Sequence, residues 1–157
     1  MTDLAMTLGD EEIQGLADSL MQIHAEVVRG KGLDLSRVVS PEKEEAIHGK
    51  IVSVAYSCFA TVFDQTPSDR FPDVFVQVAT FAQHFAKDHI FADGNKRTTV
   101  IACFSLLDQE GIEIAVPDSQ DRLANEIYKA IQRLVTGAAN VGDFADFLRR
   151  ASSCRTS

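Results

Sequence analysis

The sequence has few of the features that mark membrane, secreted or zinc-binding proteins. It has no tryptophan, three cysteines without CxxC spacing, and no run of 18 apolar residues. Its most apolar stretch, residues 51–63, contains two serines and a threonine and is too short to cross a bilayer. An odd number of cysteines favours free, buried thiols in a reducing compartment over a disulfide framework or a zinc site.

Basic residues are also scarce. The chain has 15 Lys and Arg residues against 23 Asp and Glu residues, which gives a net charge of −8. No basic run exceeds a pair, whereas nucleic-acid-binding proteins usually carry a basic stripe. The N-terminus also lacks the charged and apolar segments of a secretion signal. With 157 residues of average composition, the sequence predicts one acidic, soluble, cytoplasmic domain that has no direct nucleic-acid partner and no membrane partner.

Apolar residues recur every three or four positions, which is the pattern of amphipathic helices. The predicted helical segments are 13–27, 41–62, 71–85, 98–107, 123–134 and 144–148. Ser40 and Pro41 form a cap followed by proline at the first helical position, residues 64–69 form a loop, and residues 111–116 form one short extended piece. We therefore predict an all-α bundle of about six helices over residues 10–151, between a flexible N-terminus (1–9) and a flexible tail (152–157). The helix after residue 97 is apolar on nearly all sides, which favours a central position.

An anion site is indicated between the third and fourth predicted helices, in the segment HIFADGNKRT. Lys96 and Arg97 fall in the first turn of the later helix, where positive charge opposes the helix dipole. Helix N-termini bind phosphate groups through free N–H groups, and Gly94 allows the backbone a close approach. The two cations would then complete a phosphate-binding site.

Two further residues of the same segment suit phosphoryl or nucleotidyl transfer. Asp93 is a hard oxygen ligand of the kind that binds Mg²⁺ together with substrate phosphates. His89 has a side chain that titrates near neutral pH and can accept a proton from an attacking hydroxyl. A base, a metal ligand and a phosphate site within nine residues are the parts that such a transferase needs.

This segment resembles the signature of the Fic/Doc family, His-x-Phe-x-Asp/Glu-Gly/Ala-Asn-Gly/Lys-Arg. The resemblance covers about residues 10–150, thinly outside the motif. It implies an all-helical fold with the motif loop at the N-terminus of a buried central helix, and ATP and Mg²⁺ as cofactors. By position, the family's roles fall on His89 as general base, Asp93 as Mg²⁺ ligand, Gly94 as the point of close backbone approach, Asn95, Lys96 and Arg97 as phosphate contacts, and Phe91 as a packing aromatic.

Two positions differ from most members of the family, which transfer AMP from ATP to a protein hydroxyl. Lys96 replaces the usual glycine, and Val100 replaces a second arginine. Both differences are typical of the Doc (death-on-curing) branch, which implies a toxin kinase that transfers the ATP γ-phosphate to a threonine of elongation factor Tu. The physical reason is that a lysine side chain fills the space that a glycine leaves for the distal phosphates. The alternatives are a Fic-type AMP transferase and a catalytically silent module that binds nucleotide or a partner.

The resemblance also bears on regulation and target binding. Some relatives inhibit themselves with a Ser/Thr-x-x-x-Glu-Gly/Asn helix, but the two nearest segments here, 7–12 and 40–45, both end in glutamate. We therefore expect a separate antitoxin chain. The family positions its target with a flap upstream of the motif, and the best candidate is residues 64–73, which include Arg70.

Overall fold

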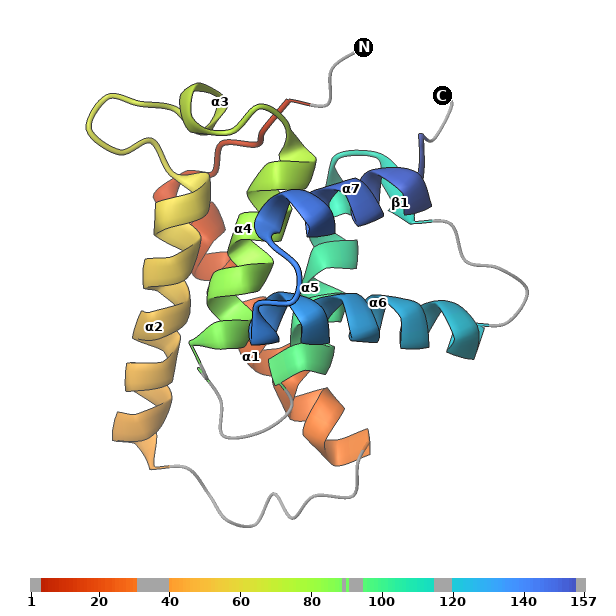
Figure 1. Cartoon of the computed structure of the whole chain (residues 1–157). Helices are drawn as coiled ribbons and strands as arrows, with labels where there is room; N and C mark the ends of the chain where they lie inside the picture. The colour runs from red at the N-terminus through yellow and green to blue at the C-terminus, as the bar shows by residue number, and fades with distance from the viewer. Residues whose placement is uncertain (1–3, 31–39, 89, 91–94, 115–119, 155–157) are drawn as a thin grey trace.

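The computed structural model describes residues 4–30, 40–88, 90, 95–114 and 120–154. Its longer helices in these ranges are α1 (Asp10–Gly30), α2 (Pro41–Phe59), α4 (Val74–Lys87), α5 (Asn95–Gln109), α6 (Gln120–Thr136) and α7 (Val141–Ala151). α4 and α5 pack together in the middle, with α1 and α2 on one side and α6 and α7 on the other (Figure 1). The predicted all-α fold is confirmed. The described residues also contain one helix that was not expected, the single turn α3 (Pro67–Arg70).

The hydrophobic core lies around α4, of whose fourteen residues nine are buried. The ring of Phe81 lies 5.3 Å from that of Phe59 on α2 and 5.5 Å from that of Phe85, measured between centroids. Each fully buried side chain of this size contributes about 1.5–3 kcal/mol of transfer free energy. α5 lies against α1, α4 and α6, as expected of a central helix, but Ile101 is 36% exposed, so α5 is not buried on all sides.

The C-terminal end of α2 has every one of its last four carbonyl groups hydrogen bonded, although a helix itself leaves these groups unpaired. The Tyr56 carbonyl accepts from the backbone N–H of Ala60, and the Ser57 carbonyl from the guanidinium of Arg70. The next two carbonyls accept from the side chain of Gln77 on α4 and from the backbone N–H of Leu8. Three different parts of the chain therefore hold the end of α2.

The described part of the N-terminal segment, which we expected to be flexible, packs on this end of α2. Ala5 and Met6 are buried, and the side-chain amide of Gln77 bonds both backbone groups of Met6. The Met6 N–H donates to Oε1 at 2.8 Å, and Nε2 donates to the Met6 carbonyl at 2.7 Å. Gln77 is fully buried, so these bonds satisfy a polar group inside the core.

The third predicted helix starts later than expected, at Val74 rather than Phe71. Asp73 ends the preceding segment by accepting a hydrogen bond from the backbone N–H of Val76 at 2.9 Å, which makes it the helix cap. Within the predicted loop 64–69, residues 67–69 belong to α3, which Thr66 and Asp69 cap reciprocally. The loop prediction was therefore wrong for α3, because a proline at a first helical position favours a turn of helix.

A short antiparallel pair of strands closes the other end of the domain. The extended piece predicted for residues 111–116 is confirmed as β1 (Ile112–Ile114), reached through a turn at Gly111 with a φ of +75°. β1 pairs with β2 (Ser152–Cys154), in the register that places Ile112 opposite Cys154. β2 thus takes the first three residues of the segment expected to be a tail.

An ion pair joins α4 to α7. Arg149 donates to one carboxylate oxygen of Asp73 from Nε at 3.1 Å and from Nη2 at 2.7 Å, and it also pairs with Asp146. Its guanidinium lies over the ring of Phe75, 5.7 Å from the centroid. The hydrogen bonds that Arg149 donates to the Asp73 carboxylate raise the pKa of Arg149, so its charge is retained at every working pH. The same carboxylate therefore caps α4 and fixes α7 on it.

Candidate functional site

The motif segment connects the two central helices. α4 ends at Lys87, and α5 begins at Asn95, as the sequence predicts for the helix that follows the motif. Ile90 is described and lies buried in the core. The other predicted site residues before α5, namely His89, Asp93 and Gly94, lie outside the described residues, as does Phe91. Their roles stay predictions.

The first turn of α5 brings the remaining predicted site residues together. Asn95 is half-buried, and its carbonyl accepts a hydrogen bond from the hydroxyl of Thr99 at 2.6 Å. Arg97 is exposed to solvent. The first N–H groups of a helix have no partner within the helix and carry its positive dipole. An exposed guanidinium at this position is therefore available to a bound anion.

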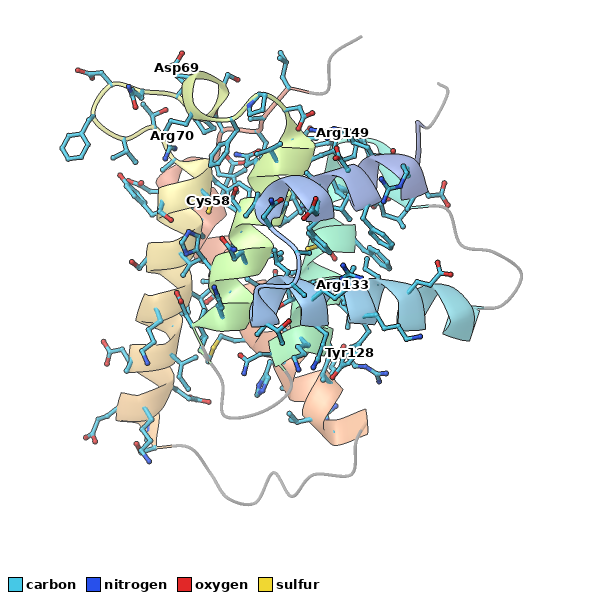
Figure 2. The ribbon with its side chains drawn as sticks, viewed as in Figure 1. Cys58, Asp69, Arg70, Tyr128, Arg133 and Arg149 are labelled. Atoms are coloured by element: carbon cyan, nitrogen blue, oxygen red, sulfur yellow. The ribbon has the colours of Figure 1, made fainter. Side chains whose placement is uncertain are left out.

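Lys96 is half-buried and lies against α6. Its Nζ donates to Oε1 of Gln132 at 2.5 Å and lies 5.9 Å from the ring centroid of Tyr128, which Figure 2 labels on α6. The two α6 residues are four positions apart and so share one face of their helix. The sequence analysis missed both residues. Their spacing on a predicted helix was a weak signal, because nothing local links them to Lys96.

Two neighbouring side chains turn from the site into the core. Thr98 is fully buried, and its hydroxyl has no hydrogen-bond partner in the part of the chain that the structure describes. Val100, at the position where the resemblance described above leads to the expectation of a second arginine, is half-buried and packs against the core. The position of that arginine is therefore taken by an apolar side chain with a packing role.

The candidate flap, residues 64–73, is held to the end of α2 by its arginine. Arg70 donates from Nη1 to the Ser57 carbonyl at 2.6 Å and from Nη2 to the Ala60 carbonyl at 2.5 Å (Figure 2). Just before α3, Val62 and Gln65 form an isolated bridge around Phe63, whose side chain is 96% exposed. Arg70 thus has a structural role, and the exposed side chains at this tip include an aromatic one.

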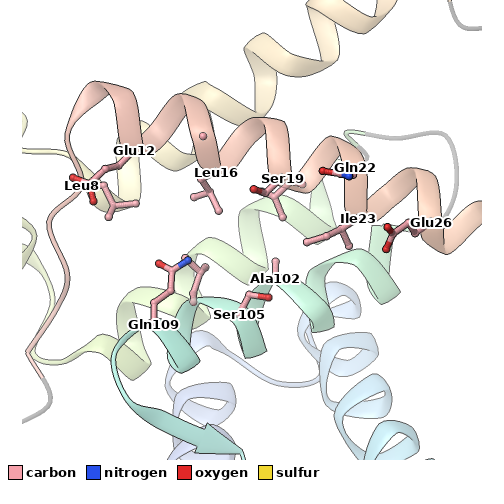
Figure 3. A pocket seen from close by; sticks show the side chains of 13 residues that line it. Leu8, Glu12, Leu16, Ser19, Gln22, Ile23, Glu26, Ala102, Ser105 and Gln109 are labelled. Carbon is pink, nitrogen blue, oxygen red and sulfur yellow. The ribbon is translucent and has the colours of Figure 1, made fainter.

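A groove of about 660 Å³ lies between α1 and α5, along one side of their contact (Figure 3). Leu16 and Ile23 of α1 and Ala102 and Gln109 of α5 line it, and acidic side chains of α1 stand at its edge. None of Asn95, Lys96 and Arg97 lines this groove. It runs along the side of α5 and is separate from the first turn that carries the predicted phosphate contacts.

The described residues provide neither a clustered metal site nor a membrane span. No three His, Cys, Asp or Glu side chains there are grouped so that they could hold a metal ion. None of the described helices combines the length and the apolar character that a membrane span requires.

The two described cysteine thiols are unsuited to nucleophilic chemistry. Burial raises the pKa of Cys58 to about 11 and that of Cys103 to about 12. A buried neutral thiol is a poor nucleophile, because the thiolate is the reactive species. The interpretation of Cys103 as a packing residue of the core is confirmed.

Comparisons with known proteins find a matching family and a curated relative. The family model described as "Fic/DOC family" matches residues 11–107. The curated protein Toxin Doc of Mycolicibacterium smegmatis (strain ATCC 700084 / mc(2)155) is 32% identical over 80 residues, which are 49% of this chain and 62% of that protein. The chain therefore matches somewhat less than two thirds of this relative's length.

Proposed function

The chain belongs to the Fic/Doc family, and on that premise we propose that it is a Doc-like toxin kinase. It would transfer the ATP γ-phosphate to a Ser or Thr hydroxyl of a translation factor and so stop translation. Elongation factor Tu is the acceptor that the family resemblance implies. We place this activity in the cytoplasm and in the domain formed by residues 10–151.

The observation that carries the proposal is the first turn of α5. The glycine of the AMP-transferring majority is replaced there by Lys96, whose ammonium group lies beside α6. The second arginine of that majority is replaced by Val100, which packs against the core. A site that lacks the second arginine and has a lysine among its predicted phosphate contacts favours γ-phosphate transfer over AMP transfer.

The roles of the chain's own residues follow from their chemistry. His89 would take the proton of the acceptor hydroxyl, which contributes about 10²–10⁴-fold in rate for a well-placed base. Asp93 would hold Mg²⁺, which supplies charge neutralisation at the phosphates. Gly94, Asn95, Lys96 and Arg97 would contact the phosphate groups, with the guanidinium giving two parallel hydrogen bonds.

The test is the intact mass of elongation factor Tu after incubation with the protein, ATP and Mg²⁺. A gain of one phosphate that is lost in His89→Ala, and retained in the matched variant of exposed His84, His84→Ala, supports the kinase. A gain of one AMP would show that the protein is an AMP transferase and that the kinase proposal is wrong. If the protein bound ATP but transferred nothing to this factor or to any protein of a bacterial extract, the alternative of a catalytically silent nucleotide-binding module would be favoured.

We also propose that a separate antitoxin restrains the activity, as the relative named Toxin Doc suggests. Expression of the chain alone should arrest growth, and expression with His89→Ala should not. If the wild-type chain were harmless alone and became toxic on deletion of residues 1–45, inhibition would lie within the chain and the antitoxin proposal would be wrong.

A further inference from the structure

We propose that Gln132 and Tyr128 of α6 are positioning residues that hold Lys96 for the phosphate groups of the nucleotide. The proposal rests on the proposed function, because it concerns the lysine of the same site. The two contacts are the hydrogen bond from Lys96 Nζ to Gln132 Oε1 at 2.5 Å and the position of Nζ 5.9 Å from the Tyr128 ring centroid.

Lys96 needs a partner from outside its own helix. It is the second residue of α5, where the dipole repels a positive charge, and a lysine stem of four carbons has many rotamers. Gln132 lies 36 residues further along the chain, on a helix that packs against α5. The amide and the ring, four positions apart on one face of α6, restrict the ammonium group to one place.

The chemistry of the acceptor suits a lysine that must still bind an anion. An ammonium group has three N–H donors, of which Gln132 takes one and leaves two for phosphate oxygens. An amide oxygen is neutral, so the positive charge of Lys96 is not cancelled, whereas a carboxylate at position 132 would form an ion pair with it. The Tyr128 ring likewise attracts a cation without neutralising it.

Isosteric substitutions at position 132 test the two halves of this argument. Gln132→Met removes the acceptor and should raise the KM for Mg-ATP about two- to tenfold with kcat much less changed, since it frees one long side chain. Gln132→Glu keeps the acceptor but adds a competing charge, and should also raise the KM, with a stronger dependence on salt. Gln132 is exposed, so both variants should fold.

Two further variants give the controls. Tyr128→Leu removes the aromatic ring and should raise the KM in the same direction as Gln132→Met. Lys129→Met changes an exposed residue that faces the groove between α6 and α7, and should leave the KM unchanged.

A readout that does not depend on transfer is the reactivity of Lys96 towards acetic anhydride, measured by peptide mass spectrometry against Lys129 in the same molecule. Gln132→Met should increase the relative acetylation of Lys96, and Gln132→Glu should decrease it. Equal acetylation in wild type and both variants would overturn the proposal, whatever the activity.

The two levels of inference fail differently. If wild type transfers phosphate but Gln132→Met and Gln132→Glu keep its KM, the positioning role is wrong and the kinase stands. If wild type transfers nothing to any protein, the kinase fails. Acetylation of Lys96 and calorimetric binding of Mg-ATP then decide the positioning role by themselves: it stands if both change in the variants as described, and it falls if either stays as in wild type.

Discussion

Replacing the buried Gln77 by leucine tests how the N-terminal segment is held to the core. In wild type this side chain makes three hydrogen bonds, to the N–H and the carbonyl of Met6 and to the carbonyl of Cys58, at 2.7–2.9 Å. Leucine has a similar size and no polar group, so it removes all three bonds without opening a large cavity.

The expected loss can be worked from these contacts. A buried hydrogen bond contributes about 1 kcal/mol net, so Gln77→Leu should lower the free energy of unfolding by about 3 kcal/mol. If the backbone groups of Met6 then leave the core to find water, the burial of its side chain is lost as well, which is worth about 1.5–3 kcal/mol. A total of about 5 kcal/mol is a large share of the 5–15 kcal/mol that is typical of a domain.

Urea unfolding followed by circular dichroism measures the loss, and hydrogen exchange read by mass spectrometry reports on residues 4–8. Gln83→Leu, at a half-buried position of the same helix, is the matched control and should change the free energy by less than about 0.5 kcal/mol. A loss below about 1 kcal/mol in Gln77→Leu, with residues 4–8 still protected, would refute the reasoning.

Four further outcomes follow from buried or capping groups. Thr98→Val should leave the free energy of unfolding unchanged or raise it by about 1 kcal/mol, since the hydroxyl has no partner among the described residues; a loss of stability in urea would show that it has one elsewhere. In Cys154→Ser protein, Ellman's reagent at pH 8 should label neither Cys58 nor Cys103 until urea unfolds the chain, and rapid labelling would contradict their burial. Folding raises the pKa of Cys58 from 9.0 to about 11 and that of Cys103 from 9.0 to about 12. The two thiols should therefore leave the free energy of unfolding constant below pH 9 and lower it as the pH rises from 9 to 12. If the same fall with pH persisted after both cysteines were replaced by serine, it would be due to other groups. Arg70→Lys should lower the free energy of unfolding by about 2 kcal/mol, because one ammonium group cannot replace the two guanidinium hydrogen bonds to the carbonyls of Ser57 and Ala60. An unchanged midpoint in urea unfolding would argue against this role of Arg70.

Where the deciding signal is local, the fold could be predicted from the sequence. The serine and proline predicted to start the second helix do so: Ser40 accepts a hydrogen bond from the N–H of Lys43 at 3.2 Å, and Pro41 is the first helical residue. The start of α5 at Asn95 was likewise readable from the segment itself. The late start of α4 was also readable, because Asp73 stands directly before the first apolar residue of that helix, but the apolar period from Phe71 was given too much weight.

Contacts between distant positions could not be predicted in this way. Gln77 lies on an apolar helix and satisfies backbone groups 71 residues away, which no periodic pattern indicates. β2 has the sequence Ser-Ser-Cys, which has little strand propensity of its own and is extended because β1 is beside it. The contact of Lys96 with Gln132 joins two polar side chains on different helices, and a single sequence does not show which such side chains meet.

The same distinction between local signals and distant contacts applies to the candidate site. The motif could be found because its residues are consecutive, and the comparisons confirm the family that it indicated. The roles of His89, Asp93 and Gly94 stay predictions, since these residues lie outside the described part of the chain. The contacts that Gln132 and Tyr128 of α6 make with Lys96 could be found only from the structure.

The ties that α4 makes to both ends of the described chain have a consequence for synthesis on the ribosome. Gln77 is bonded to Met6, which is made before it, whereas Asp73 is bonded to Arg149, which is made 76 residues later. While residues 141–151 are still missing, the face of α4 that α7 covers stays open to water, so the domain cannot be completed during elongation of its first half. A ribosome stalled before residue 141 should therefore carry a chain that proteases cut readily, and the domain would gain its finished form only after α7 has been made.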